Sequence, residues 1–294
     1  MTDFSIIDKL KRSKILDLLQ EGKRIDGRAL DEHRTLEVVT GVIPHANGSA
    51  RVRLGDTEVV AGVKIQPDRP FPDTGDRGIF ICTAEILPLA HPSAETGPPQ
   101  PPVIELARVV DRGIRESGMI DLSQCVLEEN KSVIGIFSDN VVTDHDGNLF
   151  DTCSYASVAA IMTSKMPKWE MKDGEPVVVE GENVDTPITT IPVSITMGRI
   201  GEFILTDPNI DEWACLDARI TITTNSDGNI VALQKGGKDG FTYEQLVKCS
   251  EISISSGAKI REIIKKAVGE TLSLIHISEP TRPLYISYAV FCLK

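Results

Sequence analysis

The sequence predicts an α+β protein built from two halves of similar plan. In each half, stretches that alternate apolar and polar residues or run β-branched come before and between stretches of helical periodicity. Strands, helices, strands and a helix therefore recur along the chain, the pattern of segregated α+β units rather than of a regular βαβ repeat. A polar stretch over 168–187, KWEMKDGEPVVVEGENVDTP, separates the two sets.

The composition is that of a globular protein and excludes several classes of function. The 294 residues are 41% hydrophobic and 25% charged, with a net charge of −12. That charge argues against nonspecific adhesion to nucleic acid, so any such contact needs a local basic patch. Six scattered cysteines without a C-x-x-C pair predict reduced thiols. No signal peptide or membrane span is evident, and the cytosol is the expected compartment.

The first half is predicted to begin with an amphipathic helix over 4–20 that docks on the body. Period-two patterns then predict three antiparallel strands within 34–66, two of them joined across Gly55-Asp56. A Pro/Gly/Asp loop over 67–78 leads to a further strand in FICTAEILPLA.

A proline-rich stretch, GPPQPP, precedes a predicted helix over 103–117 with a buried apolar stripe. A strand over 132–143, a DHDG turn and a small-residue helix over 151–165 complete this half. The turn resembles part of a calcium loop, but Tyr155 stands where that loop needs a bidentate glutamate, so no metal site is predicted.

The second half is predicted to contain strands at 191–197, 203–206, 218–224 and 229–235, followed by a long helix over 242–268. Gly236-Gly237 is interpreted as a flexible loop before that helix. We divide the chain into an N-terminal helix and arm (1–30), a first domain (31–185), a second domain (186–270) and a tail (271–294). The tail reads as non-native sequence, and a genuine tail that docks on a partner is the alternative.

Several stretches together resemble the RNase PH family. They are RIDGR (24–28), NGSARVRLGDTEVVAGVK (47–64), ILPLAHPS (86–93), ELARVVDRGIRES, TDHDGNLFDTCSYASVAAIM, the segment from PVSITMGRIG to DARITI, and NIVALQKGGKDGFT. Their joint order covers about 4–268. Within the family, the chain is most similar to the ring subunit of the archaeal exosome that pairs with the catalytic subunit.

This resemblance implies an RNase PH fold, whose first half is like ribosomal S5 domain 2, in a subunit of a hexameric ring around a pore. It implies a catalytic sibling subunit, RNA-binding cap subunits and RNA as partners, with no cofactor, no metal and no membrane. Catalytic members of the family degrade RNA from the 3′ end with phosphate as the attacking group.

Phosphorolysis needs a cradle of backbone N–H groups for phosphate, cations for the RNA and a carboxylate for proton transfer. Catalytic relatives have a glycine, a threonine and an arginine after the Asp-Gly turn, where this chain has Asn148, Leu149 and Phe150. Asp151 follows, and we expect its carboxylate to cap the helix and to repel an anion there.

Two further positions depart from the catalytic pattern. Pro101, Pro102 and Val103 replace an arginine pair ahead of the Glu-Leu that opens the first long helix. Asp207 is retained, but Trp213 stands where a second acidic residue is expected, with Asp211 and Glu212 nearby as alternatives. The prediction is therefore a subunit that is not itself an enzyme, and the alternative is an active phosphate-dependent exoribonuclease with a divergent phosphate turn.

Arg108, Arg112 and Arg115 share one predicted helical face. From the residues alone, a solvated face with Asp111 and Glu116 as neighbours is the simpler reading. The resemblance implies that this helix borders the RNA path at a subunit joint. Guanidinium groups donate paired hydrogen bonds to phosphate, so Arg112 and Arg115, with Arg108 beside them, are the candidate RNA-binding residues.

Overall fold

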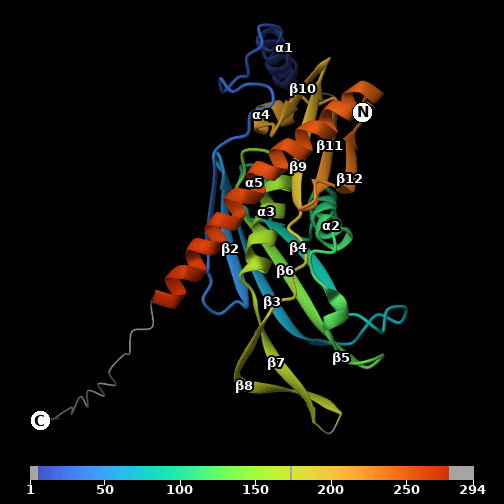
Figure 1. Ribbon diagram of the computed structural model, residues 1–294. Helices are drawn as coiled ribbons and strands as arrows, with labels where there is room; N and C mark the ends of the chain where they lie inside the picture. The colour runs from blue at the N-terminus through green and yellow to red at the C-terminus, as the bar shows by residue number, and fades with distance from the viewer. Residues whose placement is uncertain (1–5, 173, 278–294) are drawn as a thin grey trace, which may run out of the picture.

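The computed structural model describes residues 6–172 and 174–277. In chain order its elements are α1 (Ile6–Gln20), β1 (Leu36–Thr40), β2 (Gly48–Leu54), β3 (Thr57–Asp68), β4 (Ile79–Ile86), α2 (Pro101–Glu116), a 3₁₀ turn (Leu122–Gln124), β5 (Val126–Glu128), β6 (Ser132–Asp144), α3 (Leu149–Met162), β7 (Lys165–Lys172), β8 (Glu175–Asp185), β9 (Val193–Ile200), β10 (Phe203–Thr206), α4 (Ile210–Trp213), β11 (Ala218–Thr224), β12 (Ile230–Gly237) and α5 (Tyr243–Ile277). They form two sheets and a separate two-stranded ribbon (Figure 1).

The first sheet runs in the order β1-β2-β3-β6-β4, with β5 on β6. All its neighbours are antiparallel except β4 and β6, which run parallel. The predicted hairpin across Gly55-Asp56 joins β2 to β3. Helices α2 and α3 pack on this sheet, α2 against β4 and α3 against β2 and β3.

Helix α3 lies between the two sheets, because it also packs against β9. Every residue from Leu149 to Ile161 is buried, so the helix has no solvent face. Its small residues allow that close approach. At Gly48 of β2, an added Cβ would lie 2.3 Å from the carbonyl oxygen of Ala160, too close for any side chain.

The second sheet is antiparallel in the order β10-β9-β11-β12. Helix α5 crosses from this sheet to β1 of the first, and buries Cys249, Ile260 and Ile264. Helix α1 docks through Ile15 and Leu19, each 1% exposed, which form a small apolar cluster with Ile200 of β9, Leu205 of β10 and Cys215. The α+β class and the docked N-terminal helix are confirmed.

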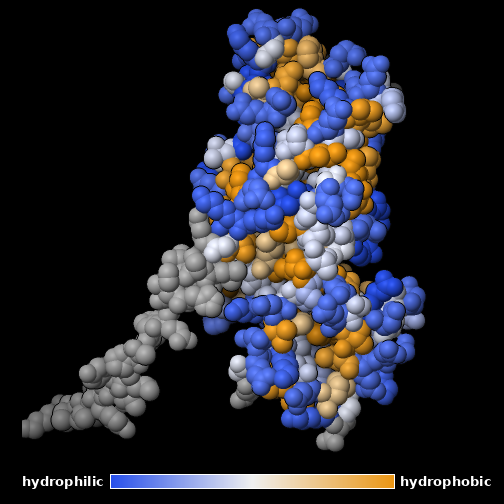
Figure 2. All heavy atoms as spheres, viewed as in Figure 1, coloured by the Kyte–Doolittle hydropathy of each residue, from blue (hydrophilic) through white to orange (hydrophobic). Residues whose placement is uncertain are grey.

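The polar stretch over 168–187, which separates the two halves in the sequence, has regular secondary structure of its own. Most of it forms the antiparallel ribbon β7–β8, which projects from the body (Figure 1). Val177, Val178 and Val184 are each more than two-fifths exposed on it. Figure 2 shows hydrophobic side chains at the surface in several patches, including the lower lobe where the ribbon lies. Exposed apolar surface of this kind marks interfaces.

Two expectations at the C-terminal end were wrong. Gly236 and Gly237 are not a loop, because they pair with Arg219 and Ala218 at the end of β12. Helix α5 continues to Ile277, past the predicted end at 268 and into the segment that we read as a non-native tail. The rest of that segment, 278–294, lies outside the described residues, so its origin stays a prediction. The division of the chain into four segments also stays a prediction. No helix in the described ranges is long and apolar enough to span a membrane.

Candidate functional site

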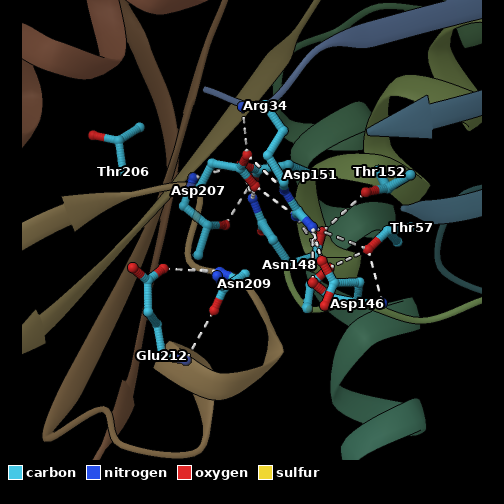
Figure 3. A network of polar contacts seen from close by, with 12 residues as sticks. Arg34, Thr57, Asp146, Asn148, Asp151, Thr152, Thr206, Asp207, Asn209 and Glu212 are labelled. Atoms are coloured by element: carbon cyan, nitrogen blue, oxygen red, sulfur yellow. Dashed lines mark hydrogen bonds and ion pairs between the residues drawn. The ribbon is translucent and has the colours of Figure 1, made fainter. Parts of the chain in front are cut away.

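Asp207 is the centre of the region that sequence reasoning compared with a catalytic site. It follows β10, has a left-handed backbone (φ 51°) and is buried. Arg34 holds its carboxylate in a two-pronged fork, with Nε 2.9 Å from Oδ2 and Nη2 2.8 Å from Oδ1 (Figure 3). The Arg34 backbone N–H and Arg28 Nη1 also donate to Oδ2, at 2.9 and 3.2 Å. The carboxylate is therefore fully engaged as an anion.

Arg24 fixes the same loop from a deeper position. Its guanidinium pairs with Glu212 through Nε–Oε1 at 2.9 Å and Nη2–Oε2 at 2.5 Å, and both side chains are 0% exposed. It also donates to the backbone carbonyls of Thr206 and Asp207. Glu212 in turn forms a capping box with Asn209 at the start of α4. The arginines of RIDGR and Arg34 thus tie the N-terminal arm to the 206–212 loop.

Glu212 and Asp211 were the alternatives to a second catalytic acid, and both have other roles. Glu212 is committed to Arg24, and Asp211 forms an ion pair with Lys11 at 2.6 Å. The Glu212 pair is fully buried, whereas the Asp211 pair lies at the surface, so the two carboxylates are held to very different degrees.

Asn148, not Asp151, is the N-cap of α3, so the predicted capping role of Asp151 was wrong. Asp151 is the third residue of the helix and lies at 0% exposure. Its carboxylate accepts from Thr196, from the backbone N–H at 2.8 Å and from Oγ1 at 2.7 Å. Because α3 packs against β9, the carboxylate accepts hydrogen bonds from that strand and not from the N–H groups of its own helix. Asn148 Nδ2 bridges Asp151 and Asp207, at 2.8 Å from each.

The carboxyl groups of Asp151 and Asp207 have very different pKa values. Burial alone would raise the pKa of Asp207, but the hydrogen bonds and charge of Arg34 outweigh it and lower that pKa to about 2. Burial raises the pKa of Asp151 to about 7, against the hydrogen bonds from Asn148 and Thr196. A general acid must carry a proton near neutral pH, and the lowered pKa of Asp207 opposes that role. The raised pKa of Asp151 favours protonation, but this side chain is sealed from solvent.

Replacing Asp151 by asparagine is expected to remove a pH dependence of stability. The pKa of Asp151 is raised above its ordinary value of 3.8, so the folded state binds more protons than the unfolded state between about pH 4 and 7. The free energy of unfolding therefore falls as pH rises through this window, by up to about 1.4 kcal/mol per pH unit. Asp151→Asn flattens that slope in urea titrations from pH 4 to 8, whereas Asp73→Asn in an exposed loop does not. An unchanged slope in Asp151→Asn would contradict the assignment.

The turn before α3 lies directly against the loop that follows β10. An added Cβ on Gly147 would lie 2.6 to 2.7 Å from backbone atoms of Pro208, Asn209 and Ile210, so the two loops are in direct backbone contact. The carbonyl of Gly147 accepts from Thr57 Oγ1 at 2.8 Å, which holds the turn against β3.

Bulky side chains pack on top of this turn. Phe150 stacks on Trp213, with ring centroids 5.9 Å apart and an angle of 26°. The Arg219 guanidinium lies over both rings, 4.6 Å from the Phe150 centroid and 5.4 Å from that of Trp213. Gly236, opposite Arg219 in the β11–β12 ladder, has no Cβ to block this placement. Arg219 also bonds Glu105 of α2. Two of the three positions that depart from the catalytic pattern, those of Phe150 and Trp213, therefore meet in one packed cluster, which Arg219 links to α2.

The candidate RNA-binding arginines are exposed on α2, but they do not share one environment. Arg108 and Arg112 line a shallow cavity of about 380 Å³ with Ile104, Glu105 and Val109, among others. Val109 lines this cavity and also packs against the hydrophobic core. Arg115 forms an i,i+4 ion pair with Asp111 at 3.3 Å. Pro101 and Pro102 open the helix, and neither has an N–H to donate.

Sequence reasoning did not assign roles to Arg24, Arg28 and Arg34. The RIDGR signal was present, but it identified only a resemblance, because the partners lie more than 170 residues away along the chain. In the Asp144-His145-Asp146 turn, Asp146 pairs with Arg34 at 3.2 Å. Among residues 6–172 and 174–277, no group of three His, Cys, Asp or Glu side chains is arranged to hold a metal ion.

The architecture is that of an RNase PH protein. It has two α+β halves, each with its own sheet, and helix α3 packs between them. Residues 32–167 match the family model of the 3′ exoribonuclease family, domain 1, and residues 190–256 match domain 2 of the same family. The chain belongs to this 3′ exoribonuclease family, as the sequence resemblance predicted.

Individual relatives agree with that assignment. The chain is 43% identical over 270 residues to the exosome complex component Rrp42 of Thermococcus gammatolerans, covering 92% of this chain and 99% of that protein. It is 45% identical to Rrp42 of Thermoplasma acidophilum over 257 residues, 87% of this chain and 96% of that one. A structure described as the Archaeoglobus fulgidus exosome with RNA bound to the active site matches with a TM-score of 0.80 and 43% identity, over 88% of this chain and 99% of that chain.

Proposed function

We propose that the chain is a non-catalytic ring subunit of an archaeal-type exosome. It would complete the ring with a catalytic sibling of the same fold and contribute contacts to RNA during 3′-to-5′ degradation. The similarity to exosome complex component Rrp42 over most of both chains supports membership of such a complex. The single observation that carries the non-catalytic part is the occupation of the expected phosphate site by the chain's own groups.

Two of the requirements of phosphorolysis, the phosphate cradle and the proton-transferring carboxylate, are opposed by physical features of the chain. Inorganic phosphate needs free N–H groups and space, but the turn at Gly147 contacts the 208–210 backbone. The Arg34 fork, which has the geometry for an oxyanion, is saturated by Asp207. Asp207 is ionised, so it has no proton to give to a leaving oxygen.

The proposed role needs partner surfaces and an RNA contact. Exposed valines on the β7–β8 ribbon support an interface with other subunits. RNA-binding cap subunits would complete the assembly, and the cytoplasm is the proposed compartment for it. Arg112 and Arg115, with Arg108, are the proposed RNA contacts, because they are exposed cations on a chain whose net charge of −12 repels RNA elsewhere.

The test is phosphate-dependent shortening of a poly(A) substrate by three preparations: this chain alone, the catalytic sibling alone, and both expressed together. We expect no turnover from this chain alone and full activity from the co-purified ring, with phosphate consumed in step with nucleoside diphosphate release. The mass of each preparation establishes whether a ring has formed. Robust turnover by this chain alone would overturn the proposal in favour of an active exoribonuclease.

A further inference from the structure

A groove of about 770 Å³ lies where the end of β4, the 87–100 segment and the start of α2 meet. His91 and His145 both line it, and their rings are in contact, with centroids 5.8 Å apart at 60°. Glu85 and Glu95 also line it. The proposed ring and RNA contacts make no use of this groove.

Hydrogen bonds determine which nitrogen of each imidazole carries the proton. His91 Nδ1 accepts from the backbone N–H of Ser93 at 3.2 Å, and His145 Nδ1 accepts from that of Gly147 at 3.2 Å. In the neutral ring, Nε2 is then the N–H donor on both residues. Burial lowers the pKa of His145 to about 4, so His145 is neutral at pH 7. The groove wall therefore includes two imidazole N–H donors.

Among the described residues, the remaining lining contains no Lys or Arg side chain; besides the neutral polar residues Thr83, Ser93, Thr96 and Gln100, it is apolar or anionic. Ile86, Pro98 and Val103 provide flat apolar surface, and Glu85 and Glu95 provide carboxylate acceptors. Pro101 and Pro102 at the start of α2 have no N–H groups with which to bind an anion. A phosphate is therefore disfavoured inside the groove, whereas a neutral ligand that both donates and accepts hydrogen bonds is favoured.

We propose that this groove binds a nucleobase that carries an exocyclic amino group, with single-stranded RNA as the source. The imidazole N–H groups match the ring-nitrogen and carbonyl acceptors of a base edge, and the carboxylates match its amino group. Adenine and cytosine offer both kinds of group, and uracil has no amino group. RNA as the source rests on the proposed function.

The neighbouring cavity supports this source. Pro101 lines the cavity of Arg108 and Arg112, and the next residue, Pro102, lines the base groove. A strand whose phosphates lie on these guanidiniums therefore has bases within reach of the groove. A proline-rich peptide is the other ligand with a shape for such a surface, but its carbonyls only accept hydrogen bonds and would leave both carboxylates unmatched.

The test uses saturation-transfer NMR on the full chain with four probes: AMP, CMP, UMP and ribose 5-phosphate. CMP and UMP are a matched pair that differs in the amino group. We expect transfer to base protons of AMP and CMP, at least fivefold weaker binding of UMP than of CMP, and no competition from ribose 5-phosphate. Equal binding of UMP and CMP, or full competition by ribose 5-phosphate, would overturn the proposal. Competition by a proline-rich peptide with no base signal would do the same, and would assign the groove to a protein.

Variants of groove residues test whether the nucleotides bind in this groove. His91→Ala is expected to weaken CMP binding at least fivefold, whereas His45→Ala, an exposed histidine elsewhere, leaves it unchanged. Glu95→Gln keeps the shape of the side chain but removes its negative charge. It is expected to narrow the difference in affinity between CMP and UMP. Unchanged binding and selectivity in both groove variants would contradict the assignment.

A hexanucleotide, A₆, tests the RNA source separately. It is expected to bind at least tenfold more tightly than AMP, because its phosphates also reach the arginine cavity. Binding no tighter than AMP would contradict RNA as the source. The poly(A) turnover assay reports on the proposed function and not on this groove, so the two can fail independently.

Discussion

Arg24→Met is expected to lower the free energy of unfolding by about 3–5 kcal/mol, a large part of the stability of an ordinary domain. The change leaves the Glu212 carboxylate buried without its partner at 0% exposure. It also removes the donors to the carbonyls of Thr206 and Asp207. An uncompensated charge cannot be solvated in that position, so the cost is far greater than the net contribution of an intact ion pair.

The matched control is Lys11→Met, which breaks an ion pair of similar length at the surface. Lys11 and Asp211 are 2.6 Å apart, with side chains 48% and 39% exposed, so solvent screens the interaction. We expect a loss below about 1 kcal/mol. Urea unfolding of both variants, followed by far-UV circular dichroism, provides the comparison. Equal losses would show that Arg24 does not hold the 206–212 loop through a buried ion pair.

Charge reversal at Arg112 and Arg115 together is expected to weaken RNA binding by the assembled ring by at least about 10²-fold. Hydrogen bonds to charged groups contribute about 1.5–3 kcal/mol each, and two are removed. Each lost phosphate contact also reduces the salt dependence, so the slope of log affinity against log salt should become shallower by about 1.4 for a single strand. Fluorescence anisotropy of a labelled oligonucleotide at several salt concentrations measures both quantities.

The control for this pair is Lys248→Glu with Lys265→Glu on α5. It changes the net charge by the same amount on another helix, and Lys265 has an intrahelical partner, Glu262, as Arg115 has Asp111. A fall in affinity without a change in slope, or equal falls for both double variants, would show that Arg112 and Arg115 act only through the overall field. The simpler reading of α2 as a solvated helical face would then hold.

Local patterns predicted most of the fold. The strands of both sheets, except the three-residue β5, and helices α1, α2, α3 and α5 follow from periodicity and turn residues, because burial of one face imposes that periodicity. The ribbon β7–β8 was not predicted. Because it projects from the body, neither of its faces is fully buried, and its sequence lacks a clear alternation of apolar and polar residues. The four-residue helix α4 is too short to show a period, and only its Asn209–Glu212 capping box marks it.

The site was predicted only where a residue's chemistry alone was informative. Phe150 was recognised as wrong for a phosphate turn and Trp213 as standing in place of a second acid, but their stacking under Arg219 depends on three distant segments. Asp151 was assigned to its own helix terminus because local position suggested it, whereas the tertiary partner Thr196 prevails. The Arg34–Asp207 fork has no local signature at all, because it forms only when the N-terminal arm crosses to the second sheet.

Diffraction from a crystal of the chain soaked in arsenate, a heavier isostere of phosphate, tests most directly whether the expected phosphate site is closed. With Gly147 against the 208–210 backbone and Asp207 in the Arg34 fork, we expect no anomalous peak near the turn. A peak within about 3.2 Å of the backbone nitrogens of residues 148–151 would contradict this account, and the chain would have to be regarded as an enzyme.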